Sequence, residues 1–467
     1  MKHRVRLRIA IVWAGCVSIS AATSGQTTLE KRLEAALGSA AGAQAAVLVH
    51  TLDGGPVFEH DADVPLKPAS VLKLFTTSAA LHRFGTNLTL DTTVFQAGDE
   101  LWVLGGGDPG LGDERLEQRA GQTNTAVFDR WAALLKQRGV TQLTNIVLDD
   151  FVFDDEPRHP TWEADQYLAW YQAPVGGLNF NDNCVDLRIE PGGNTPRLIV
   201  IPPLPDEFVI TELRSGRKHG VTARRPAESD LFEIRGSVAR AEDLGSLAVR
   251  RPNVFFGQAL RQGLESRGIV VRGEVVRRRL AGRLAEAKLV DVHSTSLRDL
   301  IWRANTFSQN LFAECLCKAL AAYGPDGQRS GEAGSWAAGT AMMRTTLTAA
   351  GVDLRGAEIV DGSGLSHENR VTARQIVTLL EVEHRAAHAQ AFIDSLAVAG
   401  EDGTLRRYRS APFVGKLRAK TGTIANVHTM AGYFDAPNGA TYVFAALGNG
   451  KNAGNLAERV VSALAGP

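Results

Sequence analysis

The sequence predicts a mixed α/β (α+β) protein in which a discontinuous main domain is interrupted by inserted β-rich domains. Helix and strand patterns typical of one α/β domain occur at both ends of the chain, whereas short strands and glycine loops dominate between them. At 467 residues the chain is longer than one ordinary domain. We therefore expect residues 25–90 and 290–467 to form the main domain and residues 91–289 to form the insertion.

The individual elements follow from the spacing of apolar residues and from turn residues. Leu29, Leu33 and Leu37 share one helical stripe, and Asn438-Gly439 is a pair typical of a hairpin turn. In the first part of the chain, the patterns predict a helix over 28–41, a strand–turn–strand unit over 44–64 and a helix from residue 70. In the middle they predict short strands from about 88, a helix near 126–138 and strands within 198–216 and 283–292. Towards the C-terminus they predict helices over 297–304 and 309–322, a hairpin over 428–450 and a final helix from about 455.

The first 24 residues are expected to be a secretory signal peptide. A basic head precedes an apolar run from Ile9 to about Ala22, and small and polar residues follow that run. The run is too short for a comfortable membrane span. A lipid-modification site at Cys16 is the weaker interpretation, because Trp13 fits that motif poorly. We therefore expect the protein to be exported.

Composition and charge argue against several classes of protein. The formal net charge is zero, so we expect no nucleic-acid partner and no electrostatic membrane anchor, while peripheral membrane association stays open. We find no motif for a metal site or an NTPase phosphate loop, and we expect neither a metal nor an organic cofactor. Beyond the signal peptide the cysteines are Cys184, Cys315 and Cys317, an odd number that favours buried, unpaired thiols.

Ser70 and Lys73 form an S-x-x-K pattern where an apolar helix begins, in the stretch KPASVLKLFTT. Residues three apart are neighbours on a helix, so both side chains face the same way. Ser70 could simply cap the helix, although a lysine in a first turn is unfavourable to the helix dipole. Alternatively, the pair is a serine nucleophile with a lysine general base. A second S-x-x-K, Ser215 to Lys218, lies in a basic, glycine-flanked turn and is predicted to be a loop.

Two further motifs supply the other groups that acyl transfer needs. An S-x-N motif, Ser308 to Asn310, lies between two predicted helices, and a K-T-G motif, Lys420 to Gly422, lies towards the C-terminus. Alone, each motif has an ordinary explanation, helix capping for the first and a solvated strand end for the second. The order and spacing of all three motifs instead favour a nucleophile, a proton relay and an anchor for a substrate carboxylate.

With these motifs, the sequence resembles the D-alanyl-D-alanine carboxypeptidase/endopeptidase type of low-molecular-mass penicillin-binding proteins, peptidase family S13. The resemblance extends over nearly all of the mature chain and includes the segments GGGDP (105–109), YQAPVGGLNFNDN (171–183), DGSGLS (361–366) and GTLRRY (403–408). Gln309 is a departure, because members often carry aspartate at this variable position; we expect no effect on the chemistry. The resemblance implies a serine transpeptidase/β-lactamase-like domain with a five-stranded sheet, and a nested module at about 185–255.

The resemblance also implies a mechanism. Ser70 would attack the carbonyl between two D-alanines of a peptidoglycan stem peptide, Lys73 would accept the serine proton, and Ser308 would relay a proton to the leaving D-alanine. An ordinary lysine pKa of about 10.4 leaves almost no neutral amine at pH 7. We therefore expect Lys420 to lie close by, lowering the pKa of Lys73, so that both amines crowd the Ser70 hydroxyl.

The remaining motif residues are expected to bind the substrate. Asn310 would hydrogen-bond the substrate backbone, Lys420 and Thr421 would hold the terminal carboxylate, and the backbone N–H groups of Ser70 and Thr423 would form the oxyanion hole. The full set of expected binding residues is Asn310, Thr421, Gly422 and Thr423. Peptidoglycan stem peptides are the expected substrates, in the periplasm or cell envelope, and β-lactam antibiotics are expected to inhibit by acylating Ser70.

Two other functions remain as alternatives. A serine β-lactamase or esterase could use the same three motifs, although the long insertion argues against a compact β-lactamase. A non-catalytic cell-wall binding protein could keep the fold, although the intact motifs argue against it. Ser363 lacks the spacing of a nucleophile elbow, and His367 has no second histidine at metal-ligand spacing. The balance of carboxypeptidase and endopeptidase activity, the stem-peptide specificity and the oligomeric state stay open.

Overall fold

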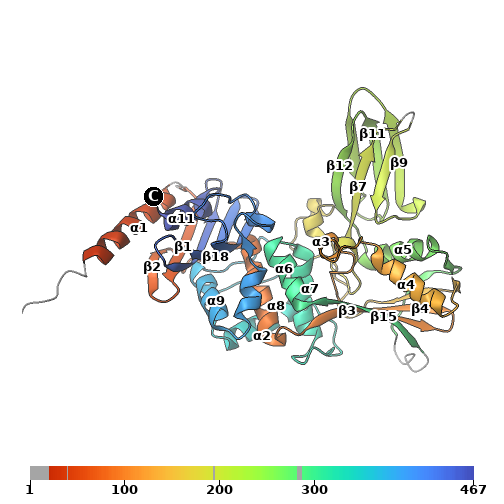
Figure 1. The fold of residues 1–467 in the computed structure, drawn as a ribbon, viewed down its shortest axis with the longest axis horizontal. Helices are drawn as coiled ribbons and strands as arrows, with labels where there is room; N and C mark the ends of the chain where they lie inside the picture. Colours follow the sequence, from red (N-terminus) through yellow and green to blue (C-terminus); the bar gives the residue numbers. More distant parts are fainter. Residues whose placement is uncertain (1–19, 39, 41, 193–194, 281–286, 467) are drawn as a thin grey trace, which may run out of the picture.

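The computed structural model describes residues 20–466 apart from 39, 41, 193–194 and 281–286, so most of the expected signal peptide lies outside the described residues. Most helices belong to the part of the molecule that the two ends of the chain form (Figure 1). The helices are α1 (Ser20–Gly38), α2 (Lys73–Phe84), α3 (Glu114–Arg119), α4 (Ala126–Gln137), α5 (Pro252–Glu265), α6 (Leu297–Thr306), α7 (Asn310–Ala322), α8 (Trp336–Ala349), α9 (Ala373–Arg385), α10 (Ala389–Ser395) and α11 (Leu456–Ala465). The inserted part contains two long helices, α4 and α5. None of the helices formed by the described residues is long and apolar enough to span a bilayer.

A six-stranded antiparallel sheet joins the two ends of the chain. Its strand order is β16 (Ala397–Val398), β17 (Leu417–Ile424), β18 (Val427–Asp435), β19 (Thr441–Asn449), β1 (Gln44–Thr51) and β2 (Gly55–His60). The short strand β16 is the sixth, where the resemblance implied five. The expected hairpin is β18 and β19, and Gly439 in its turn has a φ of 84°, a conformation that glycine adopts without strain.

Both faces of this sheet are buried. Val47 and Val49 of β1 belong to the core that α1 and α11 cover, whereas Ala46 and Leu48 belong to the core beneath α9. Side chains alternate between the faces of a strand, so a strand covered on both faces is apolar at successive positions. The sheet therefore lies at the centre of this half of the molecule, with helices on both of its faces (Figure 1).

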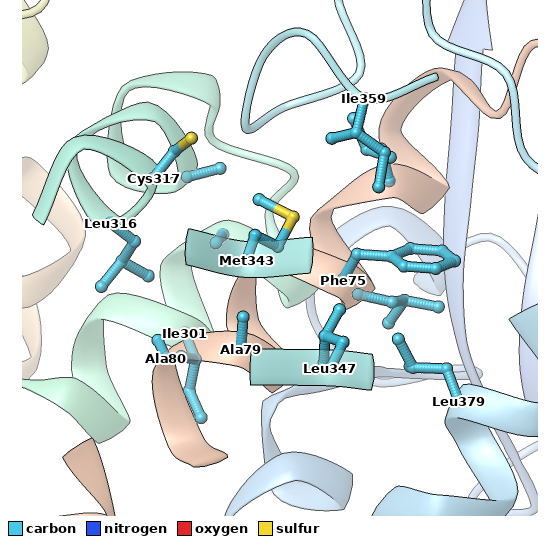
Figure 2. Packing of buried hydrophobic residues seen from close by; sticks show 14 of the residues in the cluster. Phe75, Ala79, Ala80, Ile301, Leu316, Cys317, Met343, Leu347, Ile359 and Leu379 are labelled. Carbon is cyan, nitrogen blue, oxygen red and sulfur yellow. The ribbon is translucent and has the colours of Figure 1, made fainter. Parts of the chain in front are cut away.

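Helix α2 is a core helix. Its side chains are buried from Lys73 to Leu81 and again at Phe84, which leaves His82 and Arg83 partly exposed. Figure 2 shows Phe75 and Ala79 of α2 packed with Met343 and Leu347 of α8. The apolar helix expected after Ser70 is confirmed, but a turn of 3₁₀ helix, Ala69–Leu72, precedes it.

A second sheet, of five strands, belongs to the middle of the sequence. Its order is β14 (Val275–Arg277), β6 (Ile146–Asp149), β4 (Glu100–Gly105), β3 (Thr89–Ala97) and β15 (Lys288–Ser296). Phe128 and Trp131 of α4 and Phe256 of α5 share its apolar core with Ile146. β3 and β15 are antiparallel, with Thr89 opposite Ser296. The chain therefore leaves the part of the molecule formed by its two ends through β3 and returns to it through the neighbouring strand β15. The domain limits given above stay a prediction.

Two three-stranded sheets stand apart from the rest of the inserted part (Figure 1). One has the order β12 (Glu242–Ala248), β7 (Cys184–Glu190), β8 (Arg197–Ile201), and the other has β10 (Gly220–Arg224), β11 (Phe232–Val238), β9 (Val209–Ser215). A short pair joins β13 (Val270–Val271) and β5 (Gln142–Leu143). The second S-x-x-K lies where β9 ends, in an exposed turn, which confirms that it is a loop. Cys184, Cys315 and Cys317 are buried and unpaired, as expected.

Candidate active site

Ser70 lies in the 3₁₀ turn that leads into α2, and Lys73 is the first residue of that helix. The preceding residue, Ala69, has a φ of 46°, in the left-handed region that disfavours residues with a Cβ by about 1–2 kcal/mol. Ser70 caps neither helix, because Pro68 and Leu72 hold the cap positions and make no side-chain cap bond. The capping interpretation of Ser70 is therefore wrong. The Ser70 hydroxyl is instead positioned by a strained turn that its neighbours hold in place.

The C-terminal strands hold this turn in place. Thr429 Oγ1 of β18 donates a hydrogen bond of 2.7 Å to the backbone oxygen of Pro68. Gly422 of β17 faces the same turn so closely that a Cβ there would lie 2.8 Å from Pro68 O and 2.9 Å from Ser70 N. The glycine of the K-T-G motif thus allows β17 to approach the Ser70 backbone.

This packing predicts the effect of Gly422→Ala. The added methyl group must push the Ser70 turn away from β17, so we expect a free energy of unfolding lower by about 1–3 kcal/mol and slower acylation of Ser70. Thermal unfolding and the rate of labelling by a fluorescent penicillin measure the two effects. Gly220→Ala is the matched control, because no atom lies within 4 Å of its added Cβ. Equal behaviour of the two variants would contradict the packing role.

The Lys73 amine joins the first two motifs. Its Nζ donates to Ser70 Oγ at 3.0 Å, to Asn310 Oδ1 at 2.6 Å and to the backbone oxygen of Ser363 at 3.0 Å. The lysine side chain is fully buried. These contacts bring the base and the nucleophile into hydrogen-bond distance, and they fix the amine from three sides.

Burial is the main cause of the altered basicity of Lys73. Loss of solvation lowers the pKa of Lys73 to about 7, although the nearby carboxyl groups of Glu314 and Asp361 raise it. The expected cause, the charge of Lys420, is thus corrected, because desolvation dominates. The two lysines do interact, since burial and then the charge of Lys73 lower the pKa of Lys420 well below its ordinary value.

Lys420 contacts the second serine of the site. Its Nζ donates to Ser308 Oγ at 2.8 Å and to the backbone oxygen of Thr421 at 2.6 Å. The expectation that both amines crowd the Ser70 hydroxyl is therefore wrong. Each lysine instead hydrogen-bonds one serine, Lys73 to Ser70 and Lys420 to Ser308. Ser308 itself has a φ of 61°, so this loop too is a strained turn.

The loop that carries Ser308 is anchored from the inserted part of the chain. Gln309 Nε2 donates to Asp182 Oδ2 at 2.7 Å, and Asn310 Nδ2 donates to the backbone oxygen of Tyr171 at 2.7 Å. Burial, together with the nearby Asp113, raises the pKa of Asp182 well above its ordinary value. Gln309 thus links the S-x-N loop to Asp182, and the expectation that its departure from aspartate leaves the chemistry unaffected stays a prediction.

Residues of the S-x-x-K and S-x-N motifs border one cavity of about 360 Å³. Its lining includes Ser70 of the first motif, Ser308 and Asn310 of the second, and Thr423, which directly follows the K-T-G motif. Trp170 and Tyr171 add aromatic walls. A larger cavity of about 530 Å³ beside Phe84 and Tyr323 contains none of these groups. The smaller cavity is therefore the candidate active site, open to a ligand that reaches both serines.

Sequence reasoning missed the groups that surround the Lys73 amine. Glu314 accepts hydrogen bonds from the backbone N–H groups of Gly362 and Ser363 at 2.8 Å and from Trp336 Nε1 at 2.7 Å. It thereby fixes the loop whose Ser363 oxygen binds Lys73. The signal was present in the segments DGSGLS and YQAPVGGLNFNDN, but nothing local to them indicates which atoms they offer.

Comparison with known proteins agrees with this geometry. The model of the D-Ala-D-Ala carboxypeptidase 3 (S13) family matches residues 27–465. The chain belongs to this family. A D-alanyl-D-alanine carboxypeptidase from Actinomadura sp. (strain R39) is 30% identical over 433 residues, which cover 86% of this chain and 77% of that protein. The carboxypeptidase DacB of Mycolicibacterium smegmatis is 29% identical over 88% of this chain and 77% of its own length.

The fold is shared with a member of known structure. The crystal structure of penicillin binding protein 4 (dacB) from Haemophilus influenzae matches with a TM-score of 0.73 at 22% identity, over 90% of this chain and 93% of that one. The S13 resemblance and the mixed α/β fold class are thus confirmed. As a member of the S13 family, the chain is a hydrolase, a serine-type D-Ala-D-Ala carboxypeptidase.

Proposed function

We propose that this S13 enzyme cleaves the bond between the two terminal D-alanines of peptidoglycan stem peptides through an acyl-enzyme on Ser70. The observation that carries the proposal is the hydrogen bond of 3.0 Å between Lys73 Nζ and Ser70 Oγ. It joins a buried amine of lowered pKa to a hydroxyl that borders the cavity. No metal or organic cofactor takes part in these steps.

In the acylation step, a bond forms between Ser70 Oγ and the carbonyl carbon as neutral Lys73 takes the hydroxyl proton. The oxyanion would accept hydrogen bonds from the backbone N–H groups of Ser70 and Thr423. The carbon–nitrogen bond then breaks, and a proton delivered through Ser308 leaves with the amine of D-alanine. Lys420 supports this route, because its amine lies 2.8 Å from Ser308 Oγ.

Substrate binding would use the rest of the third motif. Lys420 and Thr421 would hold the terminal carboxylate, and a bound anion would favour the charged form of Lys420. Asn310 would hydrogen-bond the peptide backbone. In deacylation, water adds to the ester carbonyl, Lys73 takes the water proton, and Ser70 leaves with a proton as the shortened peptide is released.

The place of action would be the periplasm or cell envelope. The basic head and apolar run of residues 1–24 support export, because both are typical of a secretory signal peptide. β-Lactam antibiotics would inhibit the enzyme by acylating Ser70. A related H. influenzae structure is described as complexed with a β-lactam.

Defined muropeptides test the proposed activity. We expect the purified mature protein to release free D-alanine from a monomeric pentapeptide and to cleave dimers that are cross-linked through D-alanine. Mass spectrometry of the products measures both reactions. An unchanged pentapeptide, together with unchanged dimers, would overturn the proposal.

The turnover of penicillin separates this activity from that of a serine β-lactamase with the same motifs. We expect a labelled penicillin to stay bound to Ser70 for many minutes, because the site is built for a peptide leaving group. Stopped-flow acylation followed by release of the label measures this lifetime. Rapid hydrolysis, at many turnovers per second, would favour the β-lactamase instead.

A further inference from the structure

A second cluster of reactive side chains lies in the same half of the molecule, at the far end of α2. His82 is in the last turn of α2, Glu383 is in the last turn of α9, and His388 directly precedes α10. The Nε2 atom of His82 lies 3.0 Å from Glu383 Oε1, and the Nε2 atom of His388 lies 3.2 Å from Glu383 Oε2. Three helices therefore converge on one carboxylate.

Well-aligned hydrogen bonds satisfy only part of this cluster. Both Nε2 atoms and Glu383 Oε2 are buried without a hydrogen-bond partner, although each nitrogen lies close to a carboxylate oxygen. The ring nitrogens are thus not directed at those oxygens. The two imidazole rings meet edge to face with their centres 4.6 Å apart. Buried polar atoms left unpaired in this way call for an explanation, such as a bound ion.

We propose that His82, Glu383 and His388 bind a divalent transition-metal cation of the Zn²⁺ type. The three ligand atoms lie within 4.8 Å of one another, which holds for this one group of three among the residues that the structure describes. Bonds of about 2.0–2.2 Å from zinc to imidazole nitrogen or carboxylate oxygen place tetrahedral ligand atoms roughly 3.3–3.6 Å apart. The two nitrogen–oxygen distances of 3.0 and 3.2 Å are close to this value, and the whole group lies within 4.8 Å. Two imidazoles select such a cation over Mg²⁺ and Ca²⁺, which prefer oxygen ligands.

The surroundings of the carboxylate suit a metal ligand. Glu383 is fully buried, and the imidazoles of His82 and His388 and the Ser78 hydroxyl lie beside its carboxyl group. The Ser78 hydroxyl donates a hydrogen bond to Oε1 and so orients the carboxylate, as outer partners of metal ligands do. The side chains of His82 and His388 are 20% and 13% exposed, so the cluster lies near the protein surface although its ligand atoms are buried.

The consequence is structural. A bound cation would connect the ends of α2 and α9 to the start of α10. Lys73 lies at the opposite end of α2, about 14 Å along the helix from His82, so the cation would brace the helix without touching the reacting groups. The sequence alone did not predict this metal site, because roughly 300 residues separate His82 from Glu383 and His388 and the three match no local motif.

Zinc titration of the untagged mature protein tests this site. We expect the chelator-treated protein to bind one Zn²⁺, measured by calorimetry and by elemental analysis after dialysis, and excess Mg²⁺ should not displace it. His82→Gln and His388→Gln should each abolish this binding, and Ser78→Ala should weaken it about 10–100-fold. His384→Gln is the matched control, because this exposed histidine lies next to Glu383 but outside the cluster, and it should bind zinc normally.

Folding of the variants is checked separately by labelling Ser70 with a fluorescent penicillin, which does not require the metal. If one histidine variant fails to fold, two measurements still test the site. They are zinc binding by the other histidine variant and the visible spectrum of Co²⁺ bound to the unaltered protein. Intense absorption bands of four-coordinate Co²⁺ would support the site. No bound zinc in the unaltered protein, or zinc binding that survives in both folded variants, would overturn the proposal.

Discussion

Ser70→Ala is expected to abolish labelling by penicillin and to reduce cleavage of a D-alanyl-D-alanine peptide by about 10⁴-fold or more. Ser70 Oγ is the atom proposed to form the covalent bond, and the other hydrogen-bond partners of the Lys73 amine, Asn310 Oδ1 and the backbone oxygen of Ser363, are not nucleophiles for this step. Radiolabelled penicillin and a D-alanine release assay measure the two effects. The fold should persist, because the lost hydroxyl accepts a single side-chain bond and the Lys73 amine keeps its bonds to Asn310 and Ser363.

The chain itself offers a matched control for this variant. Ser215 occupies the same position in the second S-x-x-K, but it lies at an exposed strand end away from the cavity. We expect Ser215→Ala to leave labelling and peptide cleavage unchanged. Peptide cleavage that persists in Ser70→Ala would point to another nucleophile and would contradict the proposed mechanism.

Lys73→Met is expected to slow acylation of Ser70 by about 10²–10⁴-fold, the usual contribution of a general base. Methionine fills the buried space of the lysine stem without offering a basic nitrogen. Pre-steady-state acylation by penicillin measures the rate constant. Lys73→Arg should be similarly slow, because a guanidinium stays protonated at all working pH values.

The pH dependence of the unaltered enzyme follows from the same amine. Because the pKa of Lys73 is lowered to about 7, the neutral amine increases as the pH rises through 7, and acylation should accelerate over roughly pH 6–8 and then level off. Burial also raises the pKa of Glu314 to about 7, so the observed midpoint belongs to the pair. A rate that stays flat over this range would contradict the role of Lys73, whereas Lys218→Met, in the second S-x-x-K, should keep the full profile.

The sequence predicted the chemistry of the site from three short patterns. Ser70 and Lys73 are three residues apart on one helical turn, and this spacing by itself places a hydroxyl beside an amine. The order of the S-x-N and K-T-G motifs indicated the remaining groups. The partners of the lysines could not be predicted in this way. The carbonyl oxygen of Ser363 and the carboxyl of Glu314 act on Lys73 from positions more than 200 residues away in the chain.

The elements of the fold were predicted with similar success and for a similar reason. Helix α4, the helices on both sides of Ser308 and the final hairpin follow from local periodicity and from turn residues. Strand β16, with two residues, carries no such pattern, because it is defined only by its pairing with β17. The pairing of β3 with β15 could not be predicted from local patterns either, although this pairing sets where the inserted part begins and ends.

By itself, the sequence determined which residues are available for acyl transfer and on which helix, loop or strand each is placed, because these properties depend on neighbours within a few positions. Only the tertiary structure decided that Lys73 holds Ser70 while Lys420 holds Ser308, and that burial rather than a second charge lowers the pKa of Lys73. Solvation and contact depend on which distant segments pack around a group. For the same reason, His82, Glu383 and His388 become a candidate metal site only when three helix ends meet.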